Sequence, residues 1–373
     1  MILPRLSIKA LFNIVHDSWK SGDDKIVKPE TSKSNSQTVT LRDVAEAAGV
    51  HLSTVSRVLN PTRRKMVSDN VAERVQKIAK DMGYKTNPFA YGLRTKKSNT
   101  IGVVVPDLAN PIFPPIIRGI ETTLRQAGHT TIFADTDEDK EEESVIVERI
   151  LARQVEGMIM ATAHRKNKGS AASIQDDIPV VLVNRGTDSG NRLSVINDDF
   201  LGAQLAVEHL IKLGHTQIAH LAGPQFLTTG FQRRKGYLAA MKKHGLKPDK
   251  NLIVPCGAFG FDDGKAGFEK LLEKNIPFTA IFAANDFLAL GCYHRMRKRN
   301  ISCPEEVSIV GYNDMPFSDM FDPALTTVKI DLYKMGQHAA ELLLKTLDGQ
   351  KDNLTSKTLV PQLIERESTA PLK

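Results

Sequence analysis

From residue 100 onward, short apolar runs alternate with amphipathic helical segments, and this alternation restricts the fold more than any other feature of the 373-residue chain. The runs, such as TIGVVV at 100–105 and VSIVGYN at 307–313, are rich in β-branched residues. Strands of this kind are buried on both faces, which is typical of parallel sheets that helices cover. The pattern therefore predicts an α/β protein built from βαβ units.

The alternating segments form two blocks, which predict two lobes, each a doubly wound parallel sheet. A helix near 331–347 and a strand near 357–364 would then pass back between the lobes. The resulting core spans residues 99–373. We expect an N-subdomain of about 99–196 and 327–348, and a C-subdomain of about 197–326 and 349–370.

Residues 40–60, TLRDVAEAAGVHLSTVSRVLN, have the form of a helix-turn-helix. Apolar residues recur at helical spacing on both sides of Gly49, which stands where a left-handed turn residue is needed. An amphipathic segment at 69–82 would close a three-helix domain over residues 38–86. The residues predicted to point inward are Val44, Ala45, Ala48, Val55 and Val58, joined by Val71, Val75, Ile78 and Met82.

The second helix of this segment keeps an outward face of small polar residues and an arginine. Such a face suits the major groove of DNA, where side chains reach base edges and phosphates. An ordinary helical hairpin is the alternative interpretation. The residues predicted to face outward are Leu52, Ser53, Thr54, Ser56 and Arg57.

Charge favours the DNA-binding interpretation. Residues 40–97 hold 12 Lys and Arg against 5 Asp and Glu, whereas residues 98–373 hold 32 against 34. The basic excess thus belongs to the small domain, and a local basic surface favours a polyanionic partner.

Composition excludes several other classes of protein. The three cysteines, Cys256, Cys292 and Cys303, form no CxxC pair, and no histidine cluster has metal-ligand spacing, so we expect neither a metal nor a cofactor. No apolar run approaches the roughly 20 residues of a membrane helix. The N-terminal residues lack a signal peptide, so we expect a cytoplasmic protein. Residues 1–37 form an extension of no assigned role, in which 28–37 is typical of a disordered linker.

Polar residues follow the predicted strands of both lobes. Ligands of open α/β sheets bind at the carboxyl ends of the strands, at switch points and between lobes. Amides, carboxylates and an arginine beside aromatic rings suit a polyhydroxylated ligand such as a sugar, although Asn and Asp are also common in turns. The strand-end residues are Asp107, Asn110, Asn184, Arg185, Asn197, Asp198, Asn285, Asp286, Asn313 and Asp314.

Several motifs resemble one family over roughly residues 38–370. These are TLRDVAEAAGV and STVSRVLN in the small domain, HLIKLGHTQIAHLAGP and RRKGY in the middle, and AANDFLALG and VSIVGYND farther on. Together they resemble the lactose-repressor (LacI/GalR) family of bacterial transcription regulators. The resemblance implies a DNA-binding headpiece, a hinge at 87–98 and a periplasmic-binding-protein-like core that binds an effector.

The resemblance also implies roles for individual residues. Leu52, Ser53 and Arg57 match base-reading positions, and Thr54 and Ser56 match phosphate-contacting positions. Asn87 and Ala90 match the hinge helix, whose Leu93 would wedge into the minor groove. The positions implied to contact the effector are Phe113, Asp198, Arg233, Phe259, Asn285, Asp286 and Asn313.

Two departures from the family pattern affect these expectations. His51 stands where relatives usually carry a serine N-cap, which predicts a weaker cap or a pH-sensitive contact. Asn313 stands where several relatives use Asp, so the class of ligand stays open.

The sequence as a whole predicts a regulator of transcription and not an enzyme. We expect a repressor of sugar-utilisation genes that binds a palindromic operator as a homodimer or tetramer and responds to a sugar or sugar phosphate. The alternative is a two-lobed sugar-binding protein without specific DNA readout. An enzyme is disfavoured because the first strand is followed by DLANP, with no GxGxxG or GxxxxGK[ST] loop and no GxSxG elbow.

Overall fold

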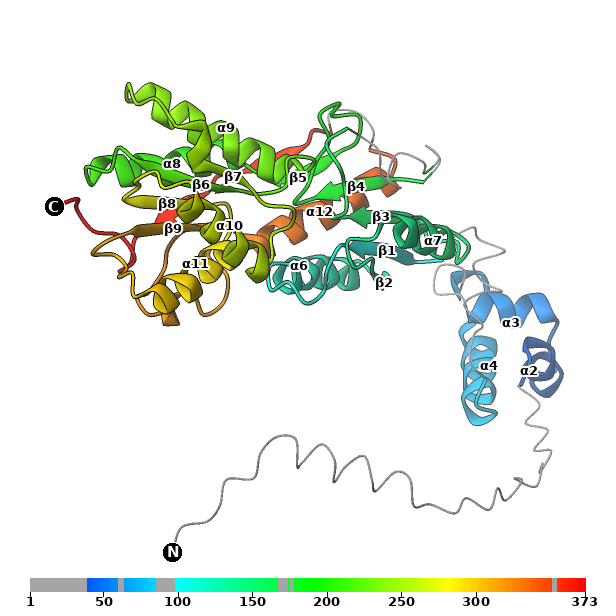
Figure 1. Ribbon diagram of the computed structural model, residues 1–373. Helices are drawn as coiled ribbons and strands as arrows, with labels where there is room; N and C mark the ends of the chain where they lie inside the picture. Colours follow the sequence, from blue (N-terminus) through cyan, green and yellow to red (C-terminus); the bar gives the residue numbers. More distant parts are fainter. Residues whose placement is uncertain (1–38, 60–63, 85–97, 167–173, 175–177, 351–353) are drawn as a thin grey trace, which may run out of the picture. The chain divides into compact units, whose positions relative to one another are not determined.

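The computed structural model describes residues 39–59, 64–84, 98–166, 174, 178–350 and 354–373 (Figure 1). The N-terminal extension, 1–37, lies outside these residues. The chain divides into two compact units, Met1–Asn87 and Pro88–Lys373, and each is described by itself.

The described part of the smaller unit is a three-helix domain. Its core is formed by the predicted residues of the first two helices together with Val75, all of them buried. On the third helix, Ala72 and Ala79 take the deepest positions beside Val75, whereas Val71, Ile78 and Met82 pack against this core half-buried. The elements are α2 (Leu41–Ala48), α3 (Leu52–Val58), the 3-10 turn η1 (Arg64–Met66) and α4 (Asp69–Asp81).

The larger unit contains two six-stranded sheets, one in each lobe. The first has the order β11-β5-β4-β3-β1-β2 and is parallel throughout. Its strands are β1 (Thr100–Val105), β2 (Thr130–Asp135), β3 (Gly157–Met160), β4 (Val180–Val183), β5 (Ser194–Asn197) and β11 (Lys357–Leu359).

The second sheet has the order β12-β10-β9-β8-β6-β7, with only β12 antiparallel to its neighbour. Its central strands β8 and β9 are buried along their whole length, as expected for strands that helices cover on both faces. Its strands are β6 (Ile218–Ala222), β7 (Ile253–Pro255), β8 (Ala280–Ala283), β9 (Ser308–Asn313), β10 (Thr326–Lys329) and β12 (Gln362–Ile364).

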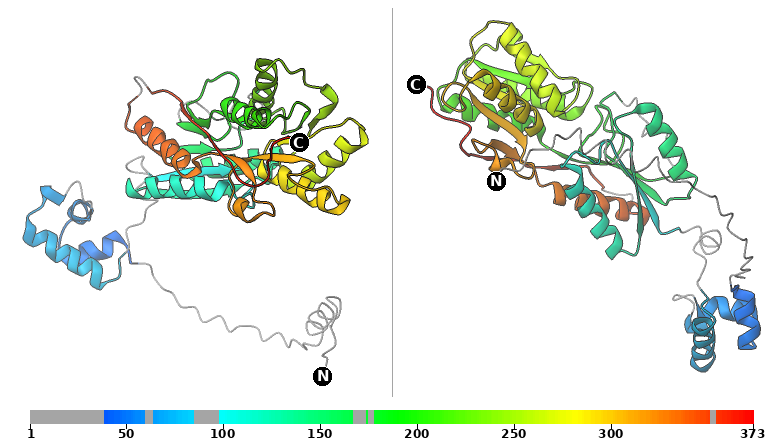
Figure 2. Two further views of the ribbon diagram at one scale, coloured as in Figure 1. Left: turned by 90° about the vertical axis from the view of Figure 1, so that its left-hand side faces the viewer. Right: turned by 60° about the horizontal axis from the view of Figure 1, so that its bottom comes forward.

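Helices cover both faces of each sheet (Figures 1 and 2). In the first lobe, α6 (Phe113–Gln126) and α12 (Leu332–Leu347) pack side by side on one face, and α7 (Lys140–Leu151) packs on the other. In the second lobe, α8 and α9 share one face, and α10 and α11 share the other. The bounds are α8 (Asp199–Lys212), α9 (Thr228–Lys243), α10 (Phe261–Glu273) and α11 (Asp286–Arg299).

The C-terminal segments return between the lobes at different points from those predicted. β10 pairs with β9 and so belongs to the second lobe, although residues 327–331 were expected in the first. β11 pairs with β5 in the first lobe, although 349–359 were expected in the second. The predicted single strand near 357–364 is therefore two short strands in different sheets, because the chain changes lobes at Val360 and Pro361.

Candidate DNA-binding surface and ligand cleft

The turn of the helix-turn-helix is fixed by the caps of α2. Thr40 and Asp43 form a reciprocal capping box, in which the Asp43 carboxylate accepts from the Thr40 backbone N–H at 2.7 Å. At the other end Gly49 adopts φ 60° and ψ 38°, a left-handed conformation that costs other L residues energy. Only three residues therefore separate the end of α2 from the start of α3.

The side chains of α3 divide into an inner and an outer face as predicted. Val55 and Val58 are buried in the core of the small domain. Of the outward residues, Leu52 is 43% exposed. Ser53 and Arg57 are also exposed, and Thr54 and Ser56 are half-buried.

The N-cap of α3 is a histidine that does cap the helix. His51 Nδ1 accepts from the Ser53 backbone N–H at 3.3 Å and lies 2.9 Å from Ser53 Oγ. The imidazole nitrogen therefore takes the place of a serine hydroxyl as acceptor, and the weaker cap or pH-sensitive contact stays a prediction. The candidate hinge residues Asn87, Ala90 and Leu93 lie outside the described residues.

Between the lobes, a cavity collects side chains from the carboxyl ends of strands in both sheets. Its volume is about 20 Å³, well below the roughly 300–1,000 Å³ of ligand pockets, so the two lobes leave little open space between these side chains. The first lobe contributes an arginine, two amides and an isoleucine, and the second contributes an arginine, two amides, a threonine and a phenylalanine. The lining residues are Asn110, Ile112, Asn184, Arg185, Thr229, Arg233, Phe259, Asn285 and Asn313.

Arg233, on the second turn of α9, is held in the cavity wall by hydrogen bonds and by a cation–π contact. Its Nε donates to Asp199 at 2.8 Å and its Nη1 to the Ala284 carbonyl at 2.6 Å. The guanidinium lies 3.7 Å from the ring centroid of Tyr312, and Nη2 donates to Asn313 Oδ1 at 3.3 Å. Burial raises the pKa of the Asp199 carboxyl, and the charge of Arg233 opposes that shift. The arginine is thus oriented in advance toward the cavity.

The two asparagines of the second lobe are held in the same way. Asn285 donates from Nδ2 to the Phe259 carbonyl at 2.9 Å and accepts from the Leu288 N–H as the N-cap of α11. Asn313 ends β9 with φ 111°, a conformation that turns its amide toward Arg233. In the first lobe, Arg185 forms two hydrogen bonds with Glu138, at 2.6 and 3.2 Å.

Four of the seven predicted effector residues line this cavity, namely Arg233, Phe259, Asn285 and Asn313. The other three do not. Phe113 is 1% exposed and packs in the hydrophobic core, while its neighbour Ile112 faces the cavity. Asp198 caps α8 by accepting from the Leu201 N–H. Asp286 accepts from Thr327 Oγ1 at 2.6 Å and from the Met315 N–H at 2.8 Å.

The cavity also contains residues that were not selected as effector contacts. Asn110, Asn184 and Arg185 were recognised as polar residues at strand ends. A prediction of effector contacts from strand ends alone would have included all three. Thr229 gave no such signal, because it lies inside the first turn of α9. In the first lobe, position at a strand end therefore predicted the polar lining residues better than the family resemblance did.

Beside the cavity, the two lobes are joined by a set of contacts around Arg165, which we call the interlobe latch. Arg165 follows β3 in the first lobe, and its Nη1 donates to the Gln225 carbonyl of the second lobe at 3.0 Å. Its guanidinium lies 3.3 Å from the ring centroid of Phe231 and forms a bidentate pair with Asp188. A second hydrogen bond joins Gly186 N–H to Thr228 Oγ1 at 3.1 Å.

Two family models match the chain in the two units described above. A model of bacterial regulatory proteins of the lacI family matches residues 40–87, and a model of periplasmic binding protein-like domains matches residues 207–369. The transcriptional regulator DegA of Bacillus subtilis is 33% identical over 336 residues, which are 89% of this chain and 98% of that protein. The chain belongs to the lacI family. Another relative, the transcriptional repressor CytR of Escherichia coli, is 32% identical over 91% of this chain and 99% of its own length.

Solved structures of lacI-family regulators share the fold. A lac repressor dimer bound to operator and an anti-inducer matches with a TM-score of 0.78 at 28% identity, over 90% of this chain and 100% of that chain. The regulator CelR in complex with cellobiose matches with a TM-score of 0.68 at 28% identity, over 88% of this chain and 99% of its own. These findings confirm the predicted family and the α/β fold with its helix-turn-helix. They also confirm a regulator of transcription in place of an enzyme.

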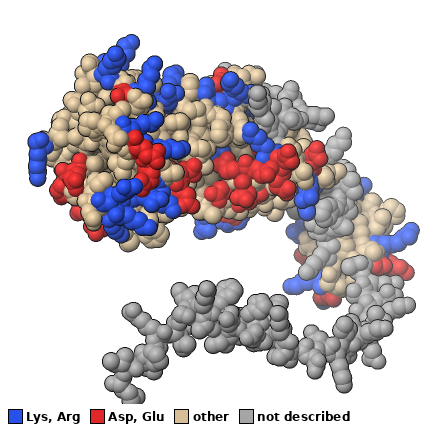
Figure 3. All heavy atoms as spheres, in the orientation of Figure 1, with Lys and Arg blue, Asp and Glu red and all other residues tan. Residues whose placement is uncertain are grey.

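The surface charge of the larger unit agrees with this assignment. On the face drawn in Figure 3, acidic side chains gather over the first lobe, where the first turn of α7 carries Glu141 and Glu142. The acidic part of this face would repel a polyanion, and the basic excess of the sequence lies in the small domain. Among the described residues, no helix has the length and apolarity to cross a membrane. The same residues contain no group of three His, Cys, Asp or Glu placed to hold a metal ion.

Proposed function

We propose that this lacI-family regulator is a repressor that binds a palindromic operator as a homodimer and is switched by a small ligand in the interlobe cavity. One observation carries the switch: a single cavity takes its lining from both lobes. A ligand there gains contacts as the lobes close, and this differential contact is what shifts a two-state equilibrium. A cytoplasmic location follows from the DNA partner.

The chemistry of the cavity favours a sugar or a sugar phosphate. Four asparagines supply both donors and acceptors, Arg185 and Arg233 supply charged donors, and Phe259 supplies an apolar face. Hydroxyl groups of a sugar are both donors and acceptors, so such a mixed lining matches them, while its C–H faces pack on aromatic rings. The CelR–cellobiose complex in the family is consistent with this class of ligand.

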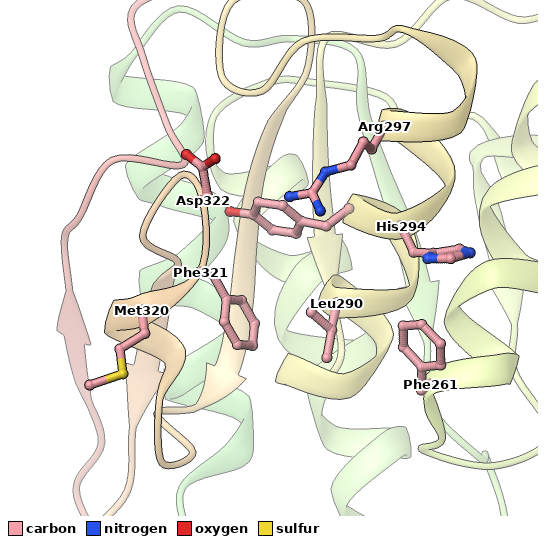
Figure 4. Close-up of a pocket in the computed structure, with 8 residues that line it drawn as sticks. Phe261, Leu290, His294, Arg297, Met320, Phe321 and Asp322 are labelled. Carbon is pink, nitrogen blue, oxygen red and sulfur yellow. The ribbon is translucent and has the colours of Figure 1, made fainter. Parts of the chain in front are cut away.

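Dimerisation is supported by a concavity on the second lobe, where five apolar or aromatic residues lie together with His294, Arg297 and Asp322 (Figure 4). Leu290 and Tyr293 of α11 line it, beside Phe261 and Phe321. On its rim, Met320 is 74% exposed, and Phe317 in the same loop is 67% exposed. We infer that a second copy covers this surface, since a two-fold axis would pair it with itself. The lac repressor dimer in the family is consistent with that arrangement.

Selection of bound DNA from a random library, with and without a panel of sugars and sugar phosphates, tests the proposal. We expect enrichment of one palindrome, with a yield that depends on one of the compounds. Removal of residues 1–97 should abolish DNA binding and leave the binding of that compound intact. Sugar binding without any enriched sequence would contradict the repressor function and favour a two-lobed sugar-binding protein.

A further inference from the structure

The chain crosses from one lobe to the other twice near its C-terminus. A second concave surface, which we call the crossover groove, lies beside these two crossings. It measures about 650 Å³ and shares no lining residue with the interlobe cavity. Its walls are the end of β10, the first two turns of α12, and residues 357–362 of β11, β12 and their connection. The groove is therefore distinct from the proposed sugar site.

The groove is basic. Three lysines, Lys329, Lys334 and Lys357, line it against one carboxylate, Asp331. Asp331 is the N-cap of α12 and accepts from the Lys334 backbone N–H at 3.0 Å, so its oxygen is already turned to the helix end. The first turn of α12 adds the partial positive charge of a helix N-terminus. Together these groups favour an anion.

The lysine charges are weakly neutralised by their neighbours. Lys329 Nζ lies 3.8 Å from Asp314, and Lys357 Nζ lies 3.8 Å from Glu341, both longer than a hydrogen bond. Lys334 is exposed and has no ion pair with any residue that the structure describes. Lys357 Nζ is also 3.2 Å from His338 Nδ1, which places the imidazole in the groove beside it. Lys334 is thus open to an incoming ligand, and Lys329 and Lys357 have carboxylate partners only at 3.8 Å.

The groove draws its charges from both lobes. Lys329 ends β10 in the second sheet, whereas Lys357 begins β11 in the first, and Lys334 lies on the helix that covers the first. When two lobes rotate about their connecting strands, distances between such residues change. A ligand that bridges the lysines would therefore bind the open and closed arrangements with different affinity.

We propose that the crossover groove binds a small metabolite that carries at least two phosphate groups, as a second ligand site that biases lobe closure. Lysines act on phosphate as point charges and tolerate different shapes of anion, so the class of ligand is set by its charge. The proposal goes beyond the sugar-responsive switch and does not depend on it, since the groove has its own lining.

Titration calorimetry of the full-length protein with inorganic pyrophosphate at low ionic strength tests the site. We expect saturable binding that weakens as salt is added, because exposed charges are screened. The variant with Lys334→Gln and Lys357→Gln should bind pyrophosphate at least tenfold more weakly. A matched variant with Lys250→Gln and Lys345→Gln, two exposed lysines outside the groove, should bind like the wild type.

Two results would overturn the site: no saturable binding at millimolar pyrophosphate, or equal binding by the groove variant and the wild type. Hydrogen exchange tests the bridge between lobes. Bound pyrophosphate should slow exchange both at 327–334 and at 357–364, and protection of only one segment would overturn the bias on closure. Neither readout involves DNA or sugar, so failure here is distinguishable from failure of the repressor function.

Discussion

At the scale of single residues, Arg233 has the most contacts in the cavity wall. Its guanidinium and the Asp199 carboxylate are 4% and 6% exposed, so neither charge has water as an alternative partner. A planar group with five donors reaches Asp199, Ala284 and Asn313 at once, which an ammonium group cannot do. The residue thus supports the fold and the cavity together.

We expect Arg233→Lys to lower the free energy of unfolding by about 1.5–3 kcal/mol, the usual contribution of a hydrogen bond to a charged group. Binding of the effector found by selection should weaken at least tenfold. Urea denaturation and calorimetry measure the two effects. Arg234→Lys, on the exposed side of the same helix turn, is the control and should change neither.

Asp286 gives a prediction for pH. Burial raises the pKa of its carboxyl to about 7, against hydrogen bonds from the Met315 N–H and the Thr327 hydroxyl. Between the ordinary aspartate pKa of 3.8 and about 7, the native state holds a proton that the unfolded chain has released. The free energy of unfolding therefore falls as pH rises through this window, by at most about 1.4 kcal/mol per pH unit from this group.

Asp286→Asn removes that titration. The difference in unfolding free energy, variant minus wild type, should increase from pH 5 to pH 8 when measured by urea denaturation at several pH values. Asp348→Asn, the same substitution at the exposed end of α12, is the control variant. A constant difference for Asp286→Asn would show that this carboxyl does not titrate near neutrality in the folded protein.

At the scale of elements, the N-cap of α3 departs from the family pattern, because the imidazole of His51 accepts the hydrogen bond that a serine hydroxyl would accept. We expect His51→Ala to destabilise the small domain by about 0.5–2 kcal/mol, the range for loss of an N-cap, and to weaken DNA binding. His51→Ser should retain most of the stability because a hydroxyl can accept from the same N–H. Circular dichroism melting and gel-shift titration measure these effects, and equal behaviour of the two variants would contradict a capping role.

Strands and helices of the core were predictable because their apolar patterns are long and repeat within each βαβ unit. The C-terminal return was not, since β11 and β12 have three residues each and their sheet is decided by partners far along the chain. Four of the five second-lobe residues that line the cavity were selected from the sequence, whereas Thr229 was missed and Phe113 was selected where Ile112 lines the wall. Adjacent residues at a helix start point in different directions, and only the packed structure shows which one turns inward.

At the scale of the whole molecule, the proposed dimer would use the surface around α11, where Met320 is exposed. Met320→Asp would place a charge on the rim of this surface, and the cost of burying it should weaken a dimer at least tenfold. Sedimentation at several concentrations measures the effect. Val145→Asp, a partly exposed apolar residue of α7 in the other lobe, is the control and should sediment like the wild type.

The interlobe latch has a consequence for how much effector the protein needs. Arg165 joins the lobes through protein atoms alone, so part of the driving force for closure is present before the proposed effector binds. A weaker latch lowers the resting fraction of closed molecules, and the apparent dissociation constant rises in inverse proportion to that fraction. Substitutions at the Arg165–Asp188 pair would therefore retune the dose at which the regulator responds, with the binding cavity itself unchanged.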